Sequence, residues 1–239
     1  MELQGGRITI VFAHLLAAYA TLVAPMLSYR KVRQLRRADA APDKTRLYRR
    51  TVLMQVVVTA SVAGLWFLGG LPTVSLGLVA PRSWWMTACV GSAFIGYFVY
   101  VSIRQRRKGQ ELRDRMRARG GAIMLPDTMY ELRWFTIMCI ASGIAEESLY
   151  RGFLYFYFSF YLPHINTPEL VLLTSFVFGI GHAYQGWSGI AATTVSGLTF
   201  GTLYSMSGSL LLPAVVHSSG NLQGVLILWP QPDIEPSRA

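Results

Sequence analysis

Long apolar segments alternate with short polar stretches along the whole chain. A helix that spans a bilayer needs about 20 mainly apolar residues, because each residue adds about 1.5 Å to its length. Runs of this kind predict seven helices, at residues 8–29, 51–71, 84–103, 134–162, 169–183, 190–206 and 210–229. We therefore expect an all-α fold, a polytopic transmembrane helical bundle of about seven spans.

Most of the positive charge lies in two stretches between the early segments. Residues 30–50 and 104–119 contain 17 of the 22 lysines and arginines. Cytoplasmic loops of membrane proteins are enriched in these residues, so both stretches are expected inside, with the N-terminus outside and the C-terminus inside. The alternative is a solvated charge run on a soluble helix. We expect anionic lipids as partners of these charges and no nucleic acid, despite the net charge of +10.

The composition supports a membrane protein. The chain is 52% hydrophobic and 14% charged, whereas soluble domains carry about 25% charged residues. The two cysteines, Cys89 and Cys139, both fall inside apolar segments. Since a free cysteine in such surroundings behaves as a small hydrophobic residue, we predict neither a disulfide framework nor a cysteine metal site.

The chain is expected to have two regions. Residues 1–132 form an N-terminal three-span region with the two basic loops, and residues 133–239 form a second helical bundle. Residues 104–133 are the one sizeable polar insertion and predict a short amphipathic helix on the cytoplasmic face. Small residues allow close helix packing in membranes, and in the last segments these are Gly179, Gly181, Gly189, Gly197 and Gly201.

Three charged residues lie near the middle of the fourth segment: Glu146, Glu147 and Arg151. Each charge at the centre of a membrane helix costs about 2.5–3.5 kcal/mol, so all three need an explanation. Glu147 and Arg151 are four residues apart and can form an ion pair on one helix face. Either all three residues only hold helices together, or this pair does so while Glu146 faces a working cavity. We favour the second hypothesis, because the first leaves one carboxylate without a partner.

Two histidines also lie in the later apolar segments. His182 follows Phe178 by four residues, and His217 precedes Asn221 by four, so each pair shares a helix face. A carboxylate can take a proton from water as a general base, and imidazole and amide groups can stabilise developing negative charge. Glu146, His182, His217 and Asn221 together therefore suit hydrolysis. The remaining histidines lack such partners and are expected to be structural: His14 and His164.

At these positions the chain resembles the CAAX-processing and bacteriocin-processing intramembrane endopeptidases, the CPBP or Abi family. The family's motifs are Glu-Glu-x-x-x-Arg, Phe-x-x-x-His and His-x-x-x-Asn. Each is short, but their order and spacing in successive apolar segments make the combined match specific, and it covers about residues 133–229. The matching residues are Glu146, Glu147, Arg151, Phe178, His182, His217 and Asn221.

The resemblance implies a glutamic-type intramembrane endopeptidase without a cofactor. In this family the first motif's glutamate activates water, which assigns that role to Glu146. His182 and His217 would orient the water or hold the oxyanion, and Asn221 would support them. The residues that would support the site structurally are Glu147, Arg151 and Phe178.

The resemblance also implies a membrane-anchored protein or peptide substrate, prenylated or otherwise anchored, which is cleaved near its C-terminus. The small chain and basic loops suit a multi-pass protein of a prokaryotic cytoplasmic membrane, where sorting tails, pheromone precursors or bacteriocin precursors are plausible substrates. A zinc-dependent peptidase is an alternative, with Glu146, His182 and His217 as ligands. That version leaves no separate base, and the chain has no His-Glu-x-x-His motif.

Two other classes of protein remain open. A non-catalytic immunity factor or scaffold would keep the motifs as a polar core. A proton-coupled transporter would use Glu146 and the histidines as a relay. Transporters of this kind are commonly built from two related halves, and the first three segments do not resemble the last four.

Overall fold

The computed structural model describes residues 6–37, 42–107 and 125–228. These residues form helices joined by short connections, and none of them lies in a strand, which confirms the all-α fold class. In chain order the helices are α1 (Gly6–Ala18), η1 (Tyr19–Val23), α2 (Ala24–Arg37), α3 (Lys44–Leu68), α4 (Thr73–Leu76), α5 (Trp84–Arg106), α7 (Met129–Glu147), η3 (Ser148–Leu154), α8 (Tyr155–Tyr161), α9 (Thr167–Gly181), η4 (Ala183–Gln185), α10 (Trp187–Ser207) and α11 (Leu211–Leu228).

All seven predicted segments are helical, and three of these helices are long and apolar enough to cross a membrane by length and composition alone. They are Gly6–Arg37, Lys44–Leu68 and Trp84–Arg106. The later helices are shorter or more polar, so the count of about seven spans is approximate. The predicted amphipathic helix falls largely on residues 108–124, outside the described residues.

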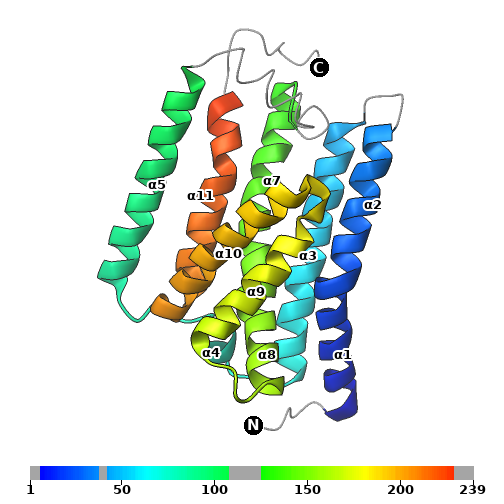
Figure 1. Cartoon of the computed structure of the whole chain (residues 1–239), viewed down its shortest axis with the longest axis vertical. Coiled ribbons are helices and arrows are strands. Elements are labelled where there is room, and N and C mark those ends of the chain that lie inside the picture. Colours follow the sequence, from blue (N-terminus) through cyan, green and yellow to red (C-terminus); the bar gives the residue numbers. More distant parts are fainter. Residues whose placement is uncertain (1–5, 38–41, 108–124, 229–239) are drawn as a thin grey trace.

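The bundle is a row of upright helices crossed by an oblique pair. α7 packs between α3 and α11, and α5 packs on the far side of α11. In Figure 1, α9 and α10 cross this row at an angle, and they pack against each other. The predicted division at residue 132 remains a prediction, although α3 and α5 from the first region both pack on helices of the second.

Side-chain caps fix where four of the helices begin. A side-chain oxygen accepts a hydrogen bond from the backbone N–H three residues later at Asp43, Ser83, Thr128 and Asn166. Each cap satisfies an N–H group that the first helical turn leaves without a partner. The start of α3 is held further by Lys44, whose Nζ donates to the carbonyl of Leu125 at 2.8 Å.

Wider π-helical turns interrupt two of the helices. η1 comes just before Pro25, a residue with no N–H to donate, and so the local hydrogen-bond pattern must change there. η3 continues α7 directly, so residues 129–161 form one long interrupted helix. Single π turns inside α-helices often occur at functional sites.

The contact between α9 and α10 depends on glycine. A Cβ atom at Gly179 would lie 2.0 Å from Thr194 Oγ1, and one at Gly201 would lie 2.9 Å from Val171 Cγ1. A Cβ atom at Gly197 would lie 3.0 Å from the Cβ of Ser175. These three glycines therefore confirm the predicted role in close helix packing.

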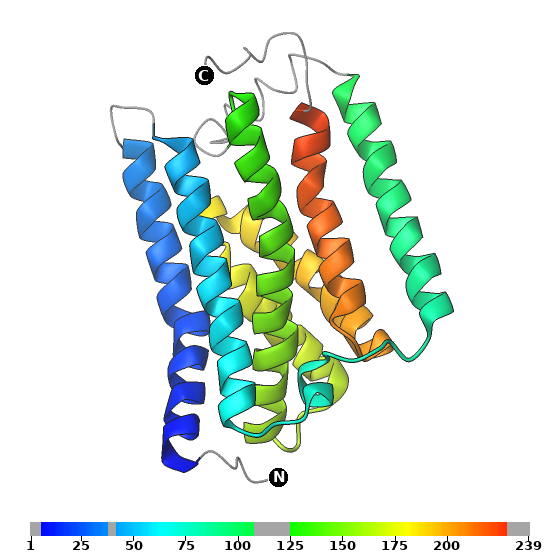
Figure 2. The same ribbon diagram turned by 180° about the vertical axis from the view of Figure 1, so that it is seen from behind.

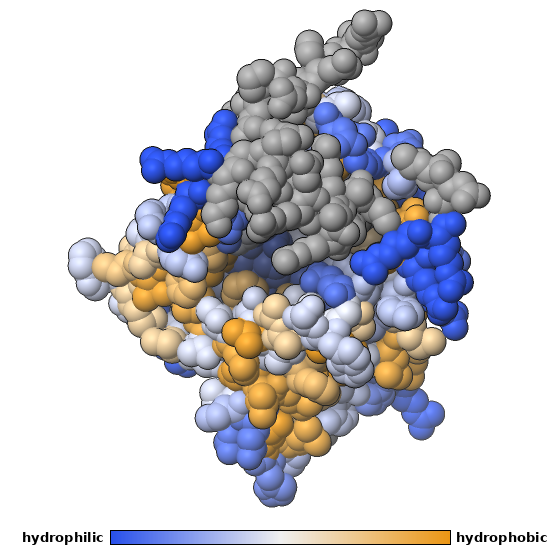
Figure 3. Space-filling model, turned by 45° about the horizontal axis from the view of Figure 1, so that its top comes forward, coloured by the Kyte–Doolittle hydropathy of each residue, from blue (hydrophilic) through white to orange (hydrophobic). Residues whose placement is uncertain are grey.

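The helix ends beside both basic stretches lie at one end of the bundle. This end also holds the last turn of α11, and the first turn of α1 is at the opposite end (Figure 1). Figure 3 shows hydrophilic side chains gathered around it. The exposed arginines of the two basic stretches, among the described residues, are Arg30, Arg33, Arg36, Arg37, Arg46, Arg49, Arg50, Arg104, Arg106 and Arg107. The described parts of both basic stretches thus lie at the same end of the bundle, as the charge pattern predicted.

Candidate active site

The two adjacent glutamates at the end of α7 have different surroundings. Glu147 is completely buried, and Arg151 in η3 is buried equally. The Arg151 guanidinium donates from Nη1 to Glu147 Oε1 at 3.0 Å and from Nη2 to the carbonyl of Gly197 at 2.8 Å. The ion pair expected from the spacing is therefore present, and it also ties η3 to α10.

Aromatic rings enclose the buried guanidinium. The Arg151 Cζ atom lies 4.9 Å from the ring centre of Phe178 and 5.6 Å from that of Phe200. An arginine over an aromatic face gains attraction from the ring's negative face, and the gain is larger where water is excluded. Phe178 from the second motif thus contacts the arginine of the first motif directly.

His217 on α11 completes this buried cluster. Its Nδ1 atom lies 2.7 Å from Glu147 Oε1, so the same carboxylate oxygen accepts from both Arg151 and His217. The imidazole stacks on Phe200, with ring centres 4.5 Å apart and planes 13° apart. Because an ionised carboxylate only accepts hydrogen bonds, Glu147 holds the proton of His217 on Nδ1. The Nε2 atom is then directed to the other glutamate.

Glu146 is the partly accessible member of the pair. Its side chain is 27% exposed, and its Oε2 atom lies 3.8 Å from His217 Nε2. This oxygen is itself buried and has no hydrogen-bond partner among the described residues. A buried carboxylate oxygen without a partner is costly unless something binds to it. Glu147 Oε2 is likewise buried without a partner among the described residues. The two glutamates differ in that Glu147 is held through Oε1 by Arg151 and His217, whereas Glu146 is partly exposed beside His217 Nε2.

His182 follows the last residue of α9. Its Nδ1 atom lies 2.9 Å from the carbonyl of Phe178. A carbonyl can only accept, so Nδ1 carries the hydrogen, and in the neutral ring Nε2 is an acceptor. His182 and His217 thus share one arrangement: in each ring Nδ1 is hydrogen-bonded within the protein, and Nε2 has no hydrogen-bond partner among the described residues.

Asn221 lies one helical turn after His217. Its Nδ2 donates to the carbonyl of Cys139 on α7 at 3.3 Å. This bond uses one of the two amide hydrogens, so the second stays available for another acceptor. Asn221 therefore helps to join α11 to α7, about two helical turns before the glutamates.

A cavity of about 380 Å³ brings these residues together. His182, His217 and Asn221 line it, together with residues from α5 and α10. Glu146 is not among the lining residues. It lies next to the cavity, because its Oε2 atom is 3.8 Å from Nε2 of His217, which does line it. The sequence analysis did not identify Phe200 or the α10 side of the cavity, because no short motif marks residues that meet only through helix packing.

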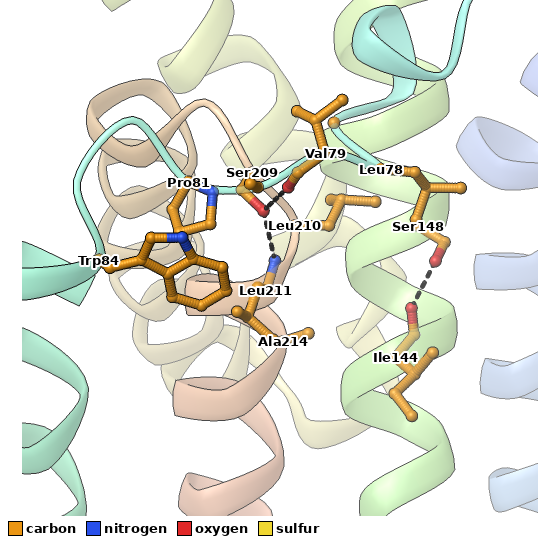
Figure 4. Close-up of a pocket in the computed structure, with 12 residues that line it drawn as sticks. Leu78, Val79, Pro81, Trp84, Ile144, Ser148, Ser209, Leu210, Leu211 and Ala214 are labelled. Atoms are coloured by element: carbon orange, nitrogen blue, oxygen red, sulfur yellow. Dashed lines mark hydrogen bonds between the residues drawn. The ribbon is translucent and has the colours of Figure 1, made fainter. Parts of the chain in front are cut away.

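A larger cavity of about 570 Å³ lies at another place in the bundle, between α7, the start of α11 and the connection before α5 (Figure 4). Its lining is nearly all apolar, and its two hydroxyl groups bond within the protein. Ser148 donates to the carbonyl of Ile144 at 2.8 Å, and Ser209 donates to that of Val79 at 2.7 Å. No titratable side chain is among its lining residues, so the larger cavity does not offer hydrolytic chemistry.

The other two histidines lie away from this cluster. His14 is exposed on α1, with Nδ1 2.7 Å from the hydroxyl of Tyr157. His164 is exposed in the connection between α8 and α9. Neither residue lines the cavity, and the structural role expected for them stays a prediction. Within the described ranges, no group of three or more His, Cys, Asp or Glu side chains is arranged to hold a metal ion.

One family model matches part of the chain. Residues 128–223 match the model described as type II CAAX prenyl endopeptidase Rce1-like. The matched region begins just before α7 and contains all three motifs, so it is consistent with the CPBP family and confirms the resemblance found in the sequence. No curated protein and no solved structure matches the chain.

Proposed function

From the match of residues 128–223 to a family of CAAX prenyl endopeptidases, we propose that this integral membrane protein is an intramembrane endopeptidase. It hydrolyses a peptide bond of a membrane-associated protein or peptide, using water activated by Glu146. The observation that carries the proposal is the partly exposed carboxylate of Glu146, whose Oε2 atom lies 3.8 Å from His217 Nε2 and has no hydrogen-bond partner among the described residues.

In the proposed reaction Glu146 is the general base. It takes a proton from water while the water oxygen forms a bond to the scissile carbonyl carbon. The C–N bond then breaks, and Glu146 returns the proton to the leaving amine. Products are a new carboxylate and a new amine, so no other reactant is needed.

The two imidazoles are proposed to orient the water and to stabilise the oxyanion. With hydrogen on Nδ1, the neutral ring of His182 or His217 accepts a hydrogen bond from water at Nε2 and orients its oxygen, while the second hydrogen of the water faces the Glu146 carboxylate. If His217 becomes protonated, it donates from Nε2 to the developing oxyanion, and the Glu147 carboxylate 2.7 Å from Nδ1 stabilises that charge. The second amide hydrogen of Asn221 supports the same oxyanion. Glu147 is then a positioning residue for His217, in addition to its ion pair with Arg151.

The substrate is proposed to be a membrane-anchored tail, prenylated or carrying another anchor. We also propose that the protein is multi-pass in a prokaryotic cytoplasmic membrane, where sorting tails and peptide precursors are candidate substrates. Anionic lipids are the proposed partners of the exposed arginines at the basic end of the bundle. We propose no nucleic acid partner.

A zinc-dependent version of the peptidase is the second candidate. Its ligands would be Glu146, His182 and His217, but in the part of the chain that the structure describes these three side chains are not arranged to hold a metal ion. When bound, zinc would polarise the carbonyl or lower the pKa of a bound water. This version gives Glu146 a different task, because a ligating carboxylate is not available as the base.

Cleavage by the purified protein tests the proposed function and separates the two candidates. The protein is reconstituted into liposomes and given a fluorogenic farnesylated CAAX peptide, its unprenylated twin and lipid-anchored sorting-tail peptides. We expect cleavage of at least one anchored peptide, unchanged by a strong chelator. Inhibition by the chelator that zinc reverses would support the metal-dependent version, and no cleavage of any peptide would favour a scaffold.

A further inference from the structure

One wall of the candidate active-site cavity carries a row of hydroxyl groups. Thr193, Ser196 and Thr199 follow each other at intervals of three residues on α10, and all three line the same cavity as His182 and His217. Residues three apart lie on neighbouring positions of one helix face. The row therefore runs along the cavity beside the proposed reaction centre.

Each of these hydroxyl hydrogens is already used inside α10. Thr193 donates to the carbonyl of Gly189 at 2.7 Å, Ser196 to that of Ala192 at 3.1 Å, and Thr199 to that of Val195 at 3.2 Å. A hydroxyl oxygen that donates its one hydrogen still has lone pairs that accept. The wall thus offers acceptors to whatever occupies the cavity, and its best partner is a molecule with N–H donors.

The other lining residues, and the absence of charged residues among them, restrict the chemistry of the occupant further. Phe94 and Phe98 from α5 line the cavity, and their rings suit an apolar side chain. Among the described residues that line it, none is Asp, Glu, Lys or Arg. The carboxylate of Glu146 beside the cavity is assigned to water in the proposed reaction, so a charged side chain of the occupant would lack an ionic partner among the lining residues. The occupant therefore has apolar side chains, amide donors and no charge.

We propose that the hydroxyl row of Thr193, Ser196 and Thr199 recognises the peptide substrate by accepting hydrogen bonds from its backbone N–H groups. The substrate class is an extended, uncharged peptide segment whose apolar side chains face Phe94 and Phe98. This inference rests on the proposed function, because it places the peptide beside Glu146. It adds three specificity-determining residues that lie outside the three motifs.

Paired peptides test the proposal by binding. The probes are the farnesylated CAAX peptide and a twin N-methylated at the amides of its last three residues, which removes those donors. Binding is measured to the Glu146→Gln protein in detergent, so that cleavage does not intervene. N-methylation is expected to weaken binding about 10-fold, the effect of losing one or two neutral hydrogen bonds.

The hydroxyl row is then removed on the same background. In the Thr193→Val, Ser196→Ala, Thr199→Val variant, the two peptides are expected to bind with equal affinity. Ser205→Ala is the matched control, since Ser205 also donates within α10, to the carbonyl of Gly201 at 2.9 Å, but does not line the cavity. It should keep the full 10-fold preference. If the triple variant does not fold, Thr193→Val alone should reduce the preference about 3-fold.

Two results would overturn this inference: an undiminished preference in the variants that lack the hydroxyls, or no binding of either peptide to the Glu146→Gln protein. Binding with the expected preference, but no cleavage by the wild-type protein, would overturn the proposed function. It would still support peptide recognition by the hydroxyl row.

Discussion

Glu146→Gln is expected to lower kcat for an anchored peptide by about 10³-fold while leaving the fold intact, because general base catalysis contributes about 10² to 10⁴ in rate. Glutamine has nearly the same shape as glutamate but cannot take a proton from water. The carboxylate is 27% exposed and its Oε2 atom has no partner among the described residues, so the change breaks no ion pair with a lysine or arginine. The measurement is the initial rate in liposomes, with thermal unfolding as the check on folding.

Glu169→Gln is the matched control for this substitution. Glu169 caps the start of α9 by accepting from the backbone N–H of Asn166 at 3.0 Å, and glutamine can make the same capping bond. The control protein should cleave at the wild-type rate. A Glu146→Gln protein that cleaves as fast as this control would remove Glu146 from the mechanism.

Arg151→Met is expected to lower the free energy of unfolding by about 3–5 kcal/mol, because it removes one partner of a buried ion pair. Arg151 and Glu147 are both fully buried. Without the guanidinium, the Glu147 carboxylate would keep only its contact with His217, and the carbonyl of Gly197 would lose its donor. The measurement is equilibrium unfolding in mixed micelles.

The same substitution at an exposed site gives the comparison. Arg46 is exposed on α3, and substitutions at such surface positions change stability by about 0.5 kcal/mol or less. Arg46→Met should therefore unfold like the wild-type protein. Equal stabilities for Arg46→Met and Arg151→Met would contradict the role given to the buried pair.

The sequence was sufficient to predict that the seven segments are helical, because their apolar stretches are long. The second segment was predicted to begin at Thr51, whereas α3 begins at Lys44. Hydropathy detects only the apolar part of a helix, and the capped first turns before it are basic. The π-helical turn η3 was not predicted, since nothing in the order of apolar residues separates a π turn from an α turn.

The candidate site was predictable where its residues are neighbours along one helix. The four-residue spacing alone predicted an ion pair between Glu147 and Arg151, and the structure contains this pair. The hydrogen bond from His217 to Glu147 joins residues 70 positions apart. It depends on how α11 packs on α7, and so does the stacking of Phe200 on His217. A single sequence carries no signal for such contacts between helices.

The origin of the oxygen in the product tests the central claim most directly. The wild-type protein is mixed in excess with the anchored peptide in H₂¹⁸O, and both the product and the Glu146-containing fragment are analysed by mass spectrometry after one turnover. If Glu146 activates water, one ¹⁸O atom enters the new carboxylate of the product and none enters Glu146. Label in the Glu146 carboxylate would indicate a covalent intermediate on that residue, and the absence of any cleaved product would contradict the assignment as a peptidase.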